Sequence, residues 1–389
     1  MQPLLLQKQT LDVGYDPGAL LLDGPNVRFT KAEQMLSKTG GPGRQFSVGV
    51  QLQGAAAITT TYSSGSTGQG FRIESMRVRD RDREITYRLN MSQAQLVAVI
   101  PDTMRQVYQI MTHREESHGE ASFRMALARD RCFLTVHADA NGGLRLNIGT
   151  PADVLPAIIR DIIHVPATRG RPQRQYPATA ATSPFSGTFD SYVASVLAQW
   201  EADHDAKLPL AGRNLETLGL TWKVQARRVS EVELELRVGR LPHALRGGAH
   251  DLVNIADVGF GVSQCLAVVV GLLAAQPGQL IYLEEPEIHL HPRAQFDLAP
   301  LLCEAAARGV RVVVETHSSL LLRGIQVAIA HKKLAPSAVK LHWFSRSEQD
   351  GTTVVSSANM DSQGAFGDWP VDFDEVVLHA ETAYLNAPA

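Results

Sequence analysis

One stretch of this sequence, residues 280–292, limits the possible folds more than any other. The apolar residues Leu280–Leu283 run directly into two acids, Glu284 and Glu285. This pattern is typical of a buried strand in a parallel sheet, and ligands bind beyond the carboxyl ends of such strands. Adjacent carboxylates there repel each other unless a cation lies between them or one is protonated. A Mg²⁺–nucleotide site would satisfy both acids, whereas a strand whose acids simply reach solvent is the alternative.

The residues around this stretch alternate between strand and helix patterns. A second short apolar strand is predicted at Val310–Val314, and the helix between the strands is predicted to begin at Pro292 and end before Gly309. Another helix, Ser319–Ala330, and a strand, Val339–Phe344, follow. This alternation favours an α/β fold with a mostly parallel, doubly wound sheet.

The earlier part of the chain has strand patterns instead. Residues 46–52, 71–73 and 85–89 alternate between apolar and polar side chains, which predicts a β-rich first lobe over residues 1–164. Within it we also expect a short strand and turn at Leu20–Asn26 and a helix between Gln93 and Arg114.

A change of composition follows the first lobe. Residues 167–187 are rich in Pro, Gly, Ser, Thr and Arg, as exposed loops are, and a helix at 189–202 and an antiparallel strand at 232–238 come next. We therefore expect an inserted α/β segment over residues 165–250, followed by a catalytic lobe over residues 251–389.

Two more polar motifs flank apolar elements in the last lobe. Gly259, Gly261, Ser263 and Gln264 precede the apolar helix predicted at Cys265–Ala275, where free backbone N–H groups and the helix dipole favour a phosphate. A Gly-x-Gly pattern alone is weak support for such a site.

The other motif is a histidine. His317 follows the strand at 310–314, so it is expected at the same sheet edge as the paired acids. An isolated histidine there is more often a capping or core residue than a catalytic one.

Taken in order, GFGVSQ, LIYLEEPEIHLHP and VVVETHS resemble the ABC-type head ATPases of the SMC and OLD kind. The likeness is greatest to a bacterial AAA subgroup with HLHP after its Walker B acids. The resemblance implies a P-loop NTPase-like ABC-type head that uses ATP and Mg²⁺. Glu284 resembles the Walker B acid that holds the metal, Glu285 the catalytic base, and His317 the switch histidine.

The resemblance also implies an assembly. Gly259–Gln264 resembles the ABC signature, which contacts the γ-phosphate of a nucleotide held by the opposite subunit, and Ile288–Pro292 resembles the D-loop. A nucleotide-gated homodimer, or a heteromer joined through the ATP site, is therefore expected. His291 belongs to this nucleotide site, although His289 and His291 could alternatively be a metal-binding pair.

One motif of the family is missing. A P-loop requires G-x-x-x-x-G-K-[ST], but none of the lysines in this sequence follows a glycine. Gln2–Leu11 resembles the helix that follows the P-loop, so we expect the chain to begin just downstream of it and to bind ATP poorly by itself. An in-frame P-loop segment upstream of the Met1 codon would support this interpretation.

Two other functions are the alternatives to an ATPase. The first is a non-hydrolysing scaffold or binding subunit of a larger complex, possible in DNA processing or defence. The second, a nuclease of the OLD type, is disfavoured because too little chain follows His317 for a second catalytic domain.

Composition limits the partners and the compartment. Lys plus Arg (37) against Asp plus Glu (40) gives a net charge of −3, so DNA is possible only through a local patch, such as the loop with Arg169, Arg171 and Arg174. A loop that bears arginines is more often just solvated, so DNA contact is the less favoured alternative. Three widely spaced cysteines argue against a disulfide framework, and the longest apolar run is about half of the roughly 20 residues of a membrane span. A cytoplasmic protein with no membrane contact is expected.

Overall fold

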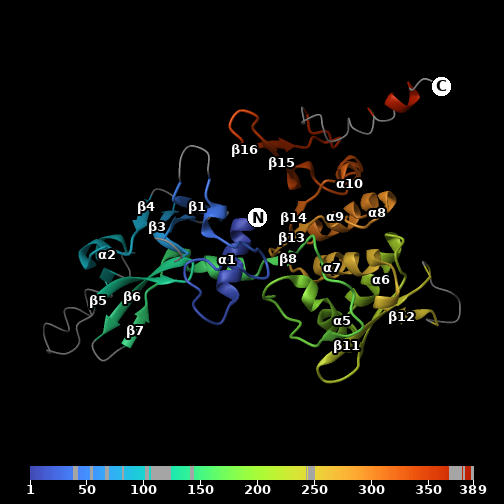
Figure 1. The fold of residues 1–389 in the computed structure, drawn as a ribbon, viewed down its shortest axis with the longest axis horizontal. Coiled ribbons are helices and arrows are strands. Elements are labelled where there is room, and N and C mark those ends of the chain that lie inside the picture. The colour runs from blue at the N-terminus through green and yellow to red at the C-terminus, as the bar shows by residue number, and fades with distance from the viewer. Residues whose placement is uncertain are drawn as a thin grey trace. The chain divides into compact units, whose positions relative to one another are not determined.

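The chain divides into two units, Met1–Asp161 and Ile162–Ala389, shown in the computed structural model of Figure 1. The structure describes residues 1–37, 43–52, 56–65, 70–80, 83–100, 105–106, 124–140, 144–241, 243, 250–367, 379 and 382–386. The three segments expected from the sequence are thus grouped as two, with the boundary close to the end of the predicted first lobe.

In the first unit, helix α1 (Gln2–Asp12) is buried although half of its residues are polar. Its polar side chains have specific partners: the amide of Gln7 donates to the hydroxyl of Tyr62 at 3.0 Å, and the ammonium of Lys8 lies 3.2 Å from the carboxylate of Asp12. Buried polar groups need such partners, because an unsatisfied one costs about 1–3 kcal/mol. The helix predicted at the start of the chain is confirmed.

The described residues of this unit also form two antiparallel sheets. One has the order β1-β2-β3-β4 and the other the order β5-β6-β7. The strands are β1 (Gln45–Gln51), β2 (Ala57–Ser64), β3 (Phe71–Asp80), β4 (Arg83–Tyr87), β5 (Arg124–Asp130), β6 (Phe133–Ala140) and β7 (Leu144–Asn147). The strands predicted from alternation correspond to β1, β3 and β4.

Of the other two predictions for this unit, one is wrong and one is only partly covered by the described residues. The strand expected at Leu20–Asn26 is wrong: only an isolated bridge between Asp23 and Arg28 forms there. The helix expected from Gln93 begins as α2 (Gln93–Val99), and most of the remainder lies outside the described residues. The unit ends with η2 (Pro151–Val154) and α4 (Leu155–Arg160).

The second unit contains the parallel sheet that positions the motifs. Its order is β14-β13-β8, from strands β8 (Ile163–Val165), β13 (Leu280–Glu284) and β14 (Arg311–Glu315). Among the described residues, parallel pairing is confined to these three strands. β13 pairs with β14 so that Glu284 lies opposite Glu315. The α/β class and the buried strand before the paired acids are confirmed.

A hydrophobic core is shared by this parallel sheet and by helices and strands between β8 and β13. It contains side chains of α5 (Val193–Ala202), α6 (Lys207–Thr217), α7 (Phe260–Ala274) and β11 (Glu233–Gly239), together with β13. β11 lies in an antiparallel sheet with β9 (Tyr176–Pro177), β10 (Val224–Arg228) and β12 (Leu252–Asn254). The core therefore continues across residue 250, where a boundary between segments was expected.

The helix predicted between β13 and β14 is two helices. α8 (Pro292–Asp297) ends at Leu298, and α9 (Ala299–Ala307) begins with Pro300 in its first turn. Proline lacks an N–H and clashes with the preceding turn, so it starts a helix more readily than it continues one. The sequence prediction overlooked this proline.

The end of the unit is a hairpin beside a helix. α10 (Ser319–Ala330) precedes β15 (Lys340–Arg346) and β16 (Thr353–Asn359), which form a two-stranded antiparallel sheet next to α10 in Figure 1. α10 has the predicted bounds. Within the part of the chain that the structure describes, every helix is too short or too polar to cross a bilayer.

Candidate functional site

The paired acids lie where β13 ends. Glu284 is the last residue of the strand, and Glu285 follows in the left-handed region with φ +41°. Its N–H donates to the backbone oxygen of Glu315 at 2.8 Å, which fixes this turn against β14. A non-glycine residue with positive φ is uncommon, and such residues cluster at functional sites.

The carboxylate of Glu284 is held from two sides. One oxygen lies 3.2 Å from Nε2 of His164 in β8, and the other accepts from the N–H of Ala167 at 3.1 Å. Burial alone would raise the pKa of Glu284, but the hydrogen bonds and electrostatic interaction with His164 and the hydrogen bond from Ala167 outweigh it and lower the pKa. Glu284 is therefore an ionised carboxylate in a fixed orientation at neutral pH.

Glu285 faces the segment that follows β14. Its carboxylate lies 3.2 Å from Nε2 of His317, whose side chain is 85% exposed. Burial and the neighbouring carboxylate of Glu287 raise the pKa of Glu285, while His317 acts in the opposite direction. The expected juxtaposition of Glu285 and His317 is present.

Glu287 organises the same segment from the inside. It is buried, and one of its carboxylate oxygens accepts from the hydroxyl of Thr316 and, at 3.2 Å, from the N–H of His317. This one side chain thus joins the turn after β13 to the turn after β14.

The residues expected to form a signature begin helix α7. Gly259 is the N-cap, and Ser263 donates its hydroxyl to the backbone oxygen of Phe260 at 2.9 Å. Gln264 is buried, and its amide donates to the backbone oxygens of Arg169 at 3.4 Å and Gly170 at 3.2 Å. The side chain of Gln264 is therefore engaged inside the protein.

The HLHP stretch lies beside this helix. The ring of His289 is 6.0 Å from that of Phe260, and a side chain at Gly261 would meet the backbone oxygen of His289 at 3.4 Å. His291 caps α8, since its Nδ1 accepts from the N–H of Arg293 at 3.4 Å. Among the described residues, no three His, Cys, Asp or Glu side chains are grouped so as to hold a metal ion.

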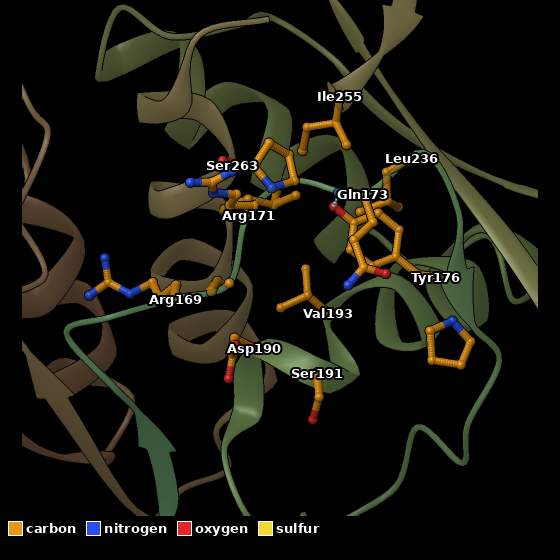
Figure 2. A pocket seen from close by; sticks show the side chains of 15 residues that line it. Arg169, Arg171, Gln173, Tyr176, Asp190, Ser191, Val193, Leu236, Ile255 and Ser263 are labelled. Atoms are coloured by element: carbon orange, nitrogen blue, oxygen red, sulfur yellow. Dashed lines mark hydrogen bonds between the residues drawn. The ribbon is translucent and has the colours of Figure 1, made fainter. Parts of the chain in front are cut away.

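Arg169 connects the two motifs. It is 5% exposed, and its guanidinium donates to the backbone oxygens of Gln264 at 3.3 Å, Glu284 at 2.9 Å and Glu285 at 3.2 Å. Figure 2 shows this side chain extending away from Tyr176 and Val193, with which it lines a cavity of about 220 Å³. Arg169 is thus an internal brace.

The loop arginines do not act together. Arg174 is exposed and pairs with Asp257 at 2.7 Å, and Arg171 is also exposed. Neither a DNA-contacting patch nor a solvated loop describes Arg169, because its guanidinium donates to backbone carbonyls inside the protein.

Sequence reasoning missed three residues of this site: His164, Arg169 as a brace, and Glu287. The signal for His164 was its place in an apolar strand, Ile163–Val165, that pairs with β13. The signal for Glu287 was a third acid in the run after the strand. Their partners are far away along the chain, so spacing alone did not reveal them.

Comparison with known protein families shows which family the chain matches. Residues 108–323, more than half of the chain, match the family described as "AAA domain, putative AbiEii toxin, Type IV TA system". The chain belongs to this family of AAA domains. The AAA-type ATPase assignment made from GFGVSQ, EEPEIHLHP and ETHS is thereby confirmed at the level of the family. No curated protein matches the chain.

Solved structures similar to this AAA domain include SMC heads. An Smc head bound to the C-winged helix domain of ScpA is 11% identical, with 87% of this chain and 83% of that chain covered and a TM-score of 0.39. An Smc head with an extended coiled coil, bound to the C-terminal domain of ScpA and derived from Pyrococcus furiosus, is 10% identical, with coverages of 98% and 89% and a TM-score of 0.33.

Proposed function

We propose that this AAA domain is a head that binds Mg²⁺-ATP and hydrolyses it, with Glu285 as the general base. The observation that carries the proposal is the position of Glu285: beyond a parallel strand, beside the fixed carboxylate of Glu284, and 3.2 Å from Nε2 of His317. A carboxylate in such a place can orient a water molecule toward a phosphate.

The residues present fit a Mg²⁺ ion of the nucleotide-bound kind. Such an ion takes most of its ligands from water and phosphate and needs only one or two carboxylates. Glu284 would hold it, since the lowered pKa keeps that carboxylate ionised. When bound, the ion would neutralise charge on the phosphates.

The remaining residues have supporting roles in this proposal. His317, exposed beside Glu285, would donate a hydrogen bond to the terminal phosphate, and Glu287 would keep the turn bearing His317 in place. The raised pKa of Glu285 makes it a stronger base than an ordinary carboxylate, provided that it is deprotonated.

The proposed active form is a dimer. Gly259, Gly261 and Ser263 lie at the start of α7, where backbone N–H groups and the helix dipole favour a phosphate. We propose that they complete the nucleotide site of the opposite subunit, with His291 and the D-loop beside them. One of the similar structures comes from work on ATP-driven dimerisation of SMC ATPases, at 14% identity and a TM-score of 0.31, covering 48% of this chain and 96% of that one.

The test is Glu285→Gln. Hydrolysis of Mg²⁺-ATP would be measured for the chain together with any residues encoded immediately before Met1, because residues 1–389 contain no P-loop lysine. We expect the rate to fall by at least about 100-fold, the usual contribution of a general base, with ATP binding retained.

The matched control is Glu304→Gln, an exposed acid on α9, which should hydrolyse ATP as the wild type does. Turnover by Glu285→Gln within a few-fold of the wild type would refute the assignment of the base. ATP-independent assembly with a partner, and no hydrolysis by any form, would instead favour a non-hydrolysing scaffold subunit.

A further inference from the structure

The hairpin β15–β16 has one face that is not covered by the described residues of its unit. The strand register pairs Lys340 with Asn359, His342 with Ser357, Phe344 with Val355, and Arg346 with Thr353. Paired residues of an antiparallel sheet share a face, and so do residues two apart along a strand. We call these eight residues the outer face of the hairpin.

The opposite side of the hairpin is anchored. Leu341 and Ala358 are opposite each other and only partly exposed. Leu341 packs against a hydrophobic cluster that includes Ile329 of α10 and Met360. Because this side packs against α10, the outer face points away from α10.

An aromatic side chain occupies the middle of the outer face. Phe344 is 68% exposed, and Val355 directly opposite is 51% exposed. Burying such apolar surface is favourable by about 25 cal/mol per Å², so a partner that covers the ring gains free energy. A flat exposed ring is also a surface on which a nucleic-acid base can stack.

Two cations and a histidine lie on the same face as this ring, and carboxylates are absent from the outer face. Lys340, His342 and Arg346 lie on the same face as Phe344, and its other members are Thr353, Val355, Ser357 and Asn359. The whole sequence from residue 316 to 347 contains no Asp or Glu, although the chain has a net charge of −3. Positive charge is thus concentrated in β15 and in the residues that precede it.

Cross-strand hydrogen bonds order part of this surface. The ammonium of Lys340 donates to the side-chain oxygen of Asn359 at 2.8 Å, and Nδ1 of His342 lies 2.7 Å from the hydroxyl of Ser357. Asp350, in the turn beyond Arg346, accepts from the N–H and hydroxyl of Thr352, so it is occupied within the turn.

We propose that the outer face of β15–β16 binds single-stranded nucleic acid, with one base stacked on Phe344 and phosphates contacting Lys340 and Arg346. An exposed aromatic ring between cations on a β surface is the combination that single-strand binding uses. A paired base in a duplex is already stacked on both faces, so Phe344 favours a single strand. This proposal does not depend on ATP hydrolysis.

The proposal is tested by fluorescence anisotropy, with the 389-residue chain added to labelled oligonucleotides. A length of about 15 nucleotides lies within the range that single-strand-binding domains cover. The probes are oligo-dT, oligo-rU and a duplex of mixed sequence. We expect both single strands to bind more tightly than the duplex, and Phe344→Ala to weaken single-strand binding by at least about fivefold, the lower end for one stacked base. The two single-stranded probes distinguish DNA from RNA as the preferred ligand.

A second variant tests the cations. In Lys340→Gln/Arg346→Gln, the log–log salt slope should become less negative by about 1.4, since each phosphate contact on a single strand contributes about 0.7. Two variants are matched controls expected to bind as the wild type does: Val354→Ser, on the other face of the same strand pair, and Arg72→Gln, an exposed cation of the first unit.

Three outcomes would overturn the proposal. In the first, the chain does not bind the single strands. In the second, Phe344→Ala binds them as tightly as the wild type does. In the third, an acidic peptide competes for the chain as well as oligo-dT does. Circular dichroism of every variant confirms that the fold is retained, so a loss of binding can be attributed to the altered side chains.

Discussion

Arg169 provides the sharpest test of how the site is held together. Its guanidinium donates to three backbone oxygens, two at the end of β13 and one in α7. Hydrogen bonds from a charged group contribute about 1.5–3 kcal/mol each, but burying the guanidinium, which lowers the pKa of Arg169, offsets part of that gain. We therefore expect Arg169→Ala to lower the free energy of unfolding by about 3–6 kcal/mol.

Urea unfolding followed by tryptophan fluorescence measures this effect, because Trp200 is buried in the core of the same unit. The controls come from the same loop. Arg171→Ala should change the free energy by about 0.5 kcal/mol or less, and Arg174→Ala by at most about 1 kcal/mol, since its ion pair with Asp257 is exposed. An effect of Arg169→Ala no larger than those of the controls would refute the role of Arg169 as a brace.

Three more predictions concern other parts of the chain. Ser263→Arg should prevent ATP-dependent dimerisation, measured by light scattering, without unfolding the chain, because the added side chain would occupy the proposed interface; an unchanged dimer population would contradict this. Lys8→Met should destabilise the first unit by about 3–5 kcal/mol in thermal unfolding, because it removes the ion-pair partner of the nearly buried Asp12, and Lys8→Met/Asp12→Leu should recover most of that loss. Burial raises the pKa of all three thiols, to about 12 for Cys132, about 12 for Cys265 and about 11 for Cys303. At about pH 8 these thiols should therefore not react with a thiol reagent in the folded protein, and all three should react once the protein is denatured.

The sequence predicted those parts of the site that depend on local pattern. Apolar runs bounded by acids or glycine located β13 and β14, and the position of His317 after β14 placed it at the same sheet edge as Glu285, where its ring indeed lies. Parallel pairing of adjacent strands is enough to bring such residues together.

What could not be predicted depends on contacts between distant residues. Arg169 and Gln264 are 95 positions apart, yet each donates to the backbone of the other's segment. An arginine in a loop rich in glycine and proline has the composition of an exposed residue, so only the packing of that loop against α7 reveals its burial. Pro300 was visible in the sequence, but the start signal at Pro292 and the stop signal at Gly309 favoured one continuous helix between them.

The pairing of β13 with β14 also limits which changes in length the protein tolerates. Five residue pairs join the two strands, and the last pair is Glu284 with Glu315. Side chains alternate between the two faces of a strand, so inserting or deleting one residue within β14 would turn its remaining side chains to the opposite face and move His317 away from Glu285. An insertion in the turn between β15 and β16 leaves that register unchanged. Length variation among relatives should therefore be found in the hairpin turn and not within these five residues.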